Sequence, residues 1–239
     1  MHSFISQILC STFVLGMGAA ACNLAPPDET LFGETGANTE PCTGETCASN
    51  TEQDDDTPTI ITDWAGNLEV DMNSSADFLT NLQTISGDLN IGPGLDISLP
   101  ALKSIAGDLL MTSNDAILTL SMANLETIGG NLELRMNNRM TTLDLPKLNT
   151  VTMGIRVALN RSIQTINIDS LISSGLSCAI TNNEALQTLN MDSFNTAGLG
   201  LEIKDNESLP TCMAQSIADQ LTSGSATISG NDSTATCDE

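Results

Sequence analysis

The feature that most constrains this chain is an asparagine that returns at a fixed interval. The members of this series, each 23 residues after the last, are Asn114, Asn137, Asn160, Asn183 and Asn206. Five apolar series repeat with the same spacing, and one of them is Leu109, Leu132, Ile155, Cys178 and Leu201. Fixed periods of this size are typical of solenoids, in which each repeat forms one coil of a stack. The sequence therefore predicts an all-β solenoid of about seven coils of ~23 residues over residues 59–239.

Each coil contains two pairs of apolar residues, as in Leu132 with Leu134 and Leu143 with Leu145. Such a pair predicts a short strand with its apolar side inward, and stacked strands lie about 4.8 Å apart. Equivalent residues then form ladders. We expect the asparagine ladder to be structural, because buried amides are normally hydrogen-bonded. Asn73 and Asn231 extend the series less strictly.

Both ends of the predicted stack carry residues that are suited to cover it. Near the C-terminus, Met213, Ile217 and Leu221 are four residues apart, which predicts a short amphipathic capping helix between the last two coils. Near the N-terminus stands the single tryptophan, Trp64. We expect it to pack over the first coil as a lid, because an open end of a solenoid exposes its core.

The pattern formed by Leu132, Leu134 and Asn137 resembles the leucine-rich repeat. The longer spacing after the asparagine, and the strings SGDLNI, AGDLLM and GGNLEL, are more similar to the receptor L-domain family. This family comprises flattened β-helices of receptor ectodomains and of many bacterial surface lipoproteins. The resemblance implies a right-handed β-helix over about residues 66–237, and it carries over no catalytic residue.

The first 58 residues differ in composition from the repeats. Residues 1–21 are largely apolar and end in small residues, which predicts a secretory signal peptide. The following Cys22 completes a string similar to the lipobox of bacterial lipoproteins, and ordinary signal cleavage is the alternative. Residues 22–58 hold nine acidic and no basic residues, which predicts a disordered tether. We expect an exported lipoprotein of the outer membrane or cell surface, held to the membrane only by a lipid on Cys22; the alternative is a secreted protein.

The positions of the cysteines predict disulfide bonds, which indicates an oxidising compartment. Cys212 and Cys237 each stand six residues after a ladder asparagine, so they occupy the same position on adjacent coils. Equivalent positions lie ~5 Å apart, within the Cα–Cα range of a disulfide. Cys42 and Cys47 are expected to close a small loop in the tether, with a metal-binding pair as the alternative. Cys178 replaces an apolar core residue and is expected to be a buried free thiol.

The residues suited to catalysis are few. The only histidine, His2, lies in the predicted signal peptide, and the chain has no tyrosine. This excludes histidine general bases, Ser-His-Asp triads and most zinc sites from the mature chain. We expect no metal and no cofactor. Residues 59–239 hold 21 acidic residues (30 minus 9) and 7 basic ones, a net charge of −14, which argues against nucleic acid as a partner.

Most of the positive charge is expected to be local. Arg135, Arg139, Arg156 and Arg161 fall in two neighbouring coils. They are either scattered charges that balance acidic neighbours, with Glu133 and Arg156 as a cross-strand pair, or a patch for an acidic protein or glycan. The sequence favours a monomeric, non-catalytic recognition or scaffold protein that binds an unknown protein or glycan along a solenoid face. The alternative is a secreted polysaccharide-active β-helix enzyme, which would need paired carboxylates on one face.

Overall fold

The structure is a computed structural model that describes residues 60–71, 76–93 and 97–237. All of them belong to one compact unit, residues 55–239. The predicted signal peptide, Cys22, the tether with Cys42 and Cys47, and the expected ladder residue Asn73 lie outside the described residues.

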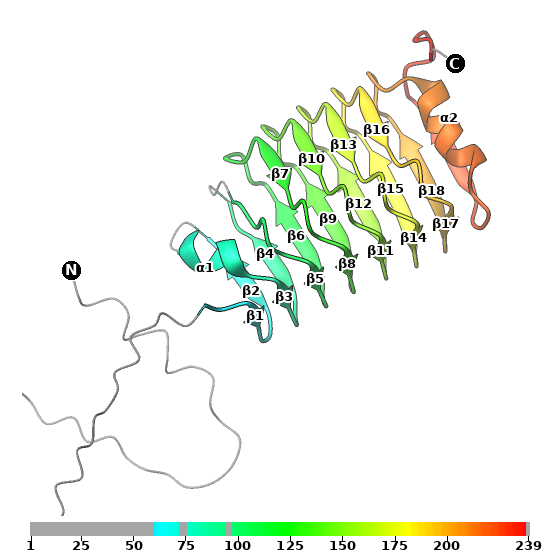
Figure 1. Ribbon diagram of the computed structural model, residues 1–239. Coiled ribbons are helices and arrows are strands. Elements are labelled where there is room, and N and C mark those ends of the chain that lie inside the picture. The colour runs from blue at the N-terminus through cyan, green and yellow to red at the C-terminus, as the bar shows by residue number, and fades with distance from the viewer. Residues whose placement is uncertain (1–59, 72–75, 94–96, 238–239) are drawn as a thin grey trace, which may run out of the picture. The chain divides into compact units, whose positions relative to one another are not determined.

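The described residues form a stack of coils whose short strands build three parallel sheets (Figure 1). Sheet A contains β1 (Asp63–Trp64), β3 (Thr84–Ile85), β5 (Ser104–Ile105), β8 (Thr127–Ile128), β11 (Thr150–Val151), β14 (Ser173–Ser174) and β17 (Thr196–Ala197). Sheet B contains β2 (Leu68–Val70), β4 (Leu89–Ile91), β6 (Leu109–Thr112), β9 (Leu132–Arg135), β12 (Ile155–Ala158), β15 (Ser177–Thr181), β18 (Gly200–Lys204) and β19 (Ala226–Ser229). Sheet C contains β7 (Thr119–Ser121), β10 (Thr142–Asp144), β13 (Thr165–Asn167) and β16 (Thr188–Asn190).

The predicted parallel solenoid of about seven coils is confirmed, and the 23-residue spacing sets its strand register. In sheet B, Leu132 pairs with Ile155, and in sheet C, Leu143 pairs with Ile166. In most strands the apolar residues point inward, and these rows form one buried core that runs through the stack. Burial of this apolar surface is the main favourable term in folding.

The coil has three strands where the sequence pattern predicts two. The additional strands are those of sheet A, which are only two residues long, such as β8 and β11. A two-residue strand places a single side chain, such as Ile128 or Val151, in the core. It therefore leaves no alternating pair in the sequence by which it can be recognised.

Two short helices cover parts of the stack. Helix α1 (Ala76–Asn81) was not expected from the sequence; its Phe78 packs against Trp64, with ring centroids 5.8 Å apart. Trp64 does lie at the N-terminal end, but as part of strand β1 and only partly buried, so it belongs to the first coil. Neither helix of the described residues has the length and apolar character that crossing a bilayer requires.

The C-terminal end is closed by the expected helix and disulfide. Helix α2 (Thr211–Asp219) lies between β18 and β19 and buries Ala214 and Ile217. Cys212 and Cys237 form the predicted disulfide, with their Cα atoms 6.1 Å apart. Together these features hold the last coil against the stack.

Candidate binding surface

The turn between sheets B and C, here called the asparagine corner, is built on the buried asparagine ladder. Asn160 is typical of it and is fully buried. Its Oδ1 accepts hydrogen bonds from the backbone N–H and the Nδ2 of Asn137, at 2.9 and 3.2 Å. Its Nδ2 donates to the carbonyl of Leu134 at 3.1 Å and to Oδ1 of Asn183 at 3.2 Å. Every polar atom of the side chain is paired, so the ladder holds the coils together and offers nothing to a ligand.

The residue before each ladder asparagine has a left-handed backbone. The five φ values are 56° at Ser113, 55° at Met136, 61° at Leu159, 55° at Asn182 and 54° at Asp205. Asparagine and aspartate tolerate this conformation better than most residues, whereas long apolar side chains are strained in it. Met136 and Leu159 are nevertheless there, with 37% and 40% of their surface exposed.

A hollow of about 390 Å³ opens at the asparagine corner across three coils. Its lining residues stand immediately before or after a ladder asparagine, and they are Ser113, Asp115, Met136, Asn138, Leu159 and Arg161. The backbone N–H of Asn138 donates to Asp115 Oδ1 at 2.9 Å. The hollow thus combines two exposed apolar side chains with one cationic, one anionic and two neutral polar groups. We call it the corner hollow.

A second, smaller hollow of about 180 Å³ lies on the outer face of sheet B, where Glu133 and Arg156 are among its lining residues. These two residues pair in register, as expected. The expected ion pair between them is not what the structure shows, because Glu133 pairs with Arg135 two residues further along its own strand, at 3.5 Å. Residues i and i+2 of a strand lie on the same face, so this partner is also within reach.

Three cationic side chains are left without a hydrogen bond or ion pair within the described residues. Four of the seven have partners: Lys103 with Gln83, Lys147 with Asn124, Lys204 with Glu202, and Arg135 with Glu133. The three without one are Arg139, Arg156 and Arg161, all exposed and all in two neighbouring coils. Arg161 lines the corner hollow and Arg156 lines the hollow on sheet B, while Arg139 lines neither.

Arg135 stands between these two hollows, at the end of strand β9. Its side chain is 30% exposed and its Nη1 is held by Glu133. Its Nε is buried without a hydrogen-bond partner in the described part of the chain. The structure therefore brings three of the four predicted arginines to one strip, which runs from sheet B to the asparagine corner.

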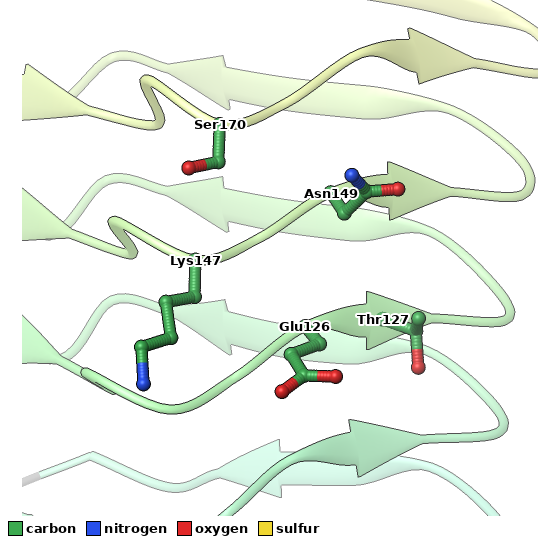
Figure 2. Close-up of a pocket in the computed structure, with 5 residues that line it drawn as sticks. All are labelled: Glu126, Thr127, Lys147, Asn149 and Ser170. Carbon is green, nitrogen blue, oxygen red and sulfur yellow. The ribbon is translucent and has the colours of Figure 1, made fainter.

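A third hollow, of about 400 Å³, lies between sheets C and A and was not expected from the sequence. Figure 2 shows its five labelled residues, which extend from loops and strand ends of neighbouring coils. Lys147 and Glu126 bring opposite charges to it, but the ammonium group of Lys147 already donates to Asn124 Oδ1 at 2.7 Å. These positions vary from coil to coil, so no repeat marks them in the sequence.

A second polar ladder, not expected from the sequence, lies at the turn between sheets A and B. We call this turn the glycine corner; its ladder consists of Asn67, Asp88, Asp108 and Asn131, each preceded by a glycine. Each ladder residue accepts a hydrogen bond from the next coil, as in Asn131 N–H to Asp108 Oδ1 at 2.6 Å. The signal was present in the repeated strings SGDLNI, AGDLLM and GGNLEL.

The ionisable groups with shifted pKa values lie outside the three hollows. Burial raises the pKa of the Cys178 thiol to about 12. Hydrogen bonds from Thr84 and then Thr62 lower the pKa of Asp63, and those from Thr234 lower the pKa of Asp232. Among the described residues, no three His, Cys, Asp or Glu side chains are grouped so that they could hold a metal ion.

Comparison with family models, curated proteins and solved structures finds no match to this chain.

Proposed function

We propose that this chain is a non-catalytic recognition or scaffold protein of the cell envelope that binds an acidic partner across sheet B and the asparagine corner. The observation that carries the proposal is the strip formed by Arg135, Arg156 and Arg161, which lies in two neighbouring coils of a strongly acidic domain. Arg156 and Arg161 have no partner in the described residues, and Arg135 is held by Glu133. A local positive patch on an acidic surface selects partners by charge complementarity.

The architecture supports binding along the stack. The asparagine ladder and the apolar rows fix each coil from within, so outward side chains vary without disturbing the frame. Solenoids use such extended faces to bind long partners. The outer face of sheet B offers eight strands in sequence, and its arginines lie near the middle.

The remaining parts of the proposal concern the family and the location of the chain. The resemblance to the receptor L-domain family supports a right-handed coil and a role in recognition. The apolar residues 1–21, followed by Cys22, support export and attachment through a lipid, with secretion as the alternative. A 37-residue acidic tether, 22–58, would then separate the solenoid from the membrane.

A polysaccharide-active enzyme would need two carboxylates facing each other across a substrate. Each of the three hollows described above has one carboxylate in its lining: Asp115 in the corner hollow, Glu133 in the hollow on sheet B, and Glu126 in the hollow between sheets C and A. No observation therefore favours this second function, and we do not propose it.

The binding proposal is tested with the full chain and two simple polyanions, poly-L-glutamate and polygalacturonate, by biolayer interferometry at low and physiological salt. We expect the double variant Arg135→Ala/Arg156→Ala to bind about tenfold more weakly, because charge-assisted contacts are lost. The matched control is Lys103→Ala/Lys147→Ala, which removes the same charge from two side chains that lie outside the strip and line neither the corner hollow nor the hollow on sheet B. Equal weakening in both double variants would mean that net charge, and not this patch, determines binding.

The location is tested by protease treatment of intact producing cells, followed by mass spectrometry of the released peptides. Release of peptides from residues 33–56 supports a solenoid outside the cell. If these peptides appear only after the envelope is broken, the surface-recognition proposal fails.

A further inference from the structure

We propose that the corner hollow binds an extended acidic peptide of a partner protein. Arg161 would hold one carboxylate of the peptide, and Met136 and Leu159 would hold one aliphatic side chain beside it. This inference rests on the proposed function and specifies the partner class and the site.

The first argument is the backbone of the two apolar residues. In the five equivalent positions φ is positive, and two of the others are Asn182 and Asp205, types that suit a left-handed backbone. Met136 and Leu159 are strained in this conformation, and their side chains are exposed. Neither backbone preference nor burial in the core therefore explains why these positions are apolar. Strained residues persist where the surrounding structure fixes them, and they cluster at ligand sites. These two line the same hollow from adjacent coils.

The second argument is the chemistry of the polar lining. Arg161 has no partner among the described residues, and a guanidinium group binds a carboxylate through two parallel hydrogen bonds. Ser113 and the side chain of Asn138 offer donors and acceptors of the kind that pair with peptide groups. Asp115 also lines the hollow, two coils away from Arg161 or roughly 10 Å at the spacing of stacked strands. Its charge favours a peptide whose acidic residue lies at the Arg161 end.

The third argument is size and the character of the apolar surface. About 390 Å³ is within the usual range of ligand pockets, roughly 300–1,000 Å³. Three coils span roughly 10 Å, which is the length of about three extended peptide residues. The lining contains no aromatic ring, and amphipathic aromatic surfaces are the usual platform for a sugar. The hollow therefore suits an aliphatic side chain better than a sugar ring.

The test uses the full chain labelled with ¹³C at the methionine methyl groups, titrated with a capped glycine-glutamate-leucine-glycine peptide. We expect the methyl resonance of Met136 to shift, because that side chain lines the hollow. Met153 is the internal control, since it is 47% exposed on the opposite turn of sheet B, and its resonance should not move. The signals are assigned from the variants Met136→Leu and Met153→Leu.

Three further probes decide the chemistry. Peptides with glutamine in place of glutamate, or serine in place of leucine, should cause little shift, and trigalacturonate should cause less than the acidic peptide. The variant Arg161→Gln should weaken peptide binding about tenfold, because a charge-assisted hydrogen bond is lost. Arg139→Gln removes the same charge from an exposed residue that does not line the hollow, and it should change binding less than about twofold.

The inference is overturned if Met136 does not respond, if Met153 responds equally, or if trigalacturonate shifts Met136 as strongly as the peptide. Failure here is distinguishable from failure of the proposed function. If the peptide leaves Met136 unchanged while polyanion binding still depends on Arg135 and Arg156, the recognition surface is sheet B alone. If the peptide binds at Met136 and protease treatment places the chain inside the envelope, the peptide site in the corner hollow is supported and the proposed role at the cell surface is contradicted.

Discussion

The asparagine corner and the glycine corner each carry a ladder of polar side chains, yet only the first is closed to solvent. Asn137, Asn160 and Asn183 are fully buried, whereas Asp88 and Asp108 are half-buried. An amide both donates and accepts, so a stack of amides satisfies itself. The glycine-corner ladder has two carboxylates in its middle. A carboxylate only accepts and carries a charge, so Asp88 and Asp108 keep some contact with water. The flanking amides are open as well, since Asn131 is half-buried and Asn67 is exposed.

The two corners also differ in how far their ladders extend. The asparagine ladder runs from Asn114 to Asn231 in the described residues. The glycine-corner ladder ends at Asn131, whose Oδ1 accepts from Gly154 N–H at 3.0 Å. Beyond it, the preceding glycine is replaced by exposed apolar residues, Met153, Leu176 and Leu199. A self-sufficient amide ladder can be extended coil by coil. Its hydrogen bonds fix the turn in which the residues with a left-handed backbone lie.

The largest expected effect comes from breaking the buried ladder with Asn160→Leu. The backbone N–H of Asn137 and the carbonyl of Leu134 would lose their partners in the interior. We expect the free energy of unfolding to fall by about 4 kcal/mol in urea denaturation, because each orphaned buried group is expensive. The control Asn190→Leu, on the outer side of sheet C, should change it by less than about 0.5 kcal/mol. A small effect of Asn160→Leu would mean that water replaces the amide and that the ladder is not what holds the corner.

A smaller loss is expected from Gly130→Ala at the glycine corner. A Cβ atom there would overlap the Asp108 carboxylate and lie 2.7 Å from the backbone carbonyl carbon of Gly107. We expect the free energy of unfolding to fall by about 2 kcal/mol, because the coils must move apart. In Gly154→Ala, one coil further, the added Cβ atom would have no neighbour closer than 3.3 Å. This control should change the free energy of unfolding by less than about 0.5 kcal/mol. Equal effects of the two variants would show that the ladder does not impose the glycine.

The buried core rows and the asparagine ladder could be predicted from the sequence because their residues repeat every 23 positions. The asparagine series and pairs such as Leu132 with Leu134 fix the coil, the register and the Cys212–Cys237 disulfide. The strands of sheet A could not be predicted, since each contributes at most one buried side chain. Helix α1 was missed because it belongs to the coils that precede the regular repeat.

The candidate site could be predicted only in part because it lies where the repeat varies. The clustering of Arg135, Arg156 and Arg161 follows from the coil length. The partner of Glu133 does not, since two arginines are within reach of it and side-chain torsions decide between them. The corner hollow depends on a left-handed backbone at Met136, which its residue type argues against.

Within the described residues, the apolar interior between the two corners holds one ionisable group, the thiol of Cys178. Burial raises the pKa of this thiol from 9.0 to about 12, so the folded chain favours the protonated form. Its contribution to stability is complete below pH 9 and is lost as the pH rises from 9 towards 12. Between pH 9 and 10, we expect the free energy of unfolding of the unaltered protein to fall by about 1 kcal/mol more than that of the variant Cys178→Val. Parallel pH profiles of the two proteins would contradict a thiol that is sealed in the core.

The smallest expected change in stability is a gain, from Met136→Asn at the asparagine corner. Asparagine tolerates the φ of 55°, so we expect the free energy of unfolding to rise by roughly 0.5–1 kcal/mol. The control Leu118→Asn removes an apolar residue that is 51% exposed and has no left-handed backbone, and it should bring no gain. Met136→Asn should at the same time weaken binding of the acidic peptide, measured by ¹⁵N amide shifts at the asparagine corner. A gain in stability together with a loss of binding would mean that the strained methionine is retained for the ligand. A gain with unchanged binding would make Met136 a tolerated irregularity of the turn, and the corner hollow would lose its apolar anchor.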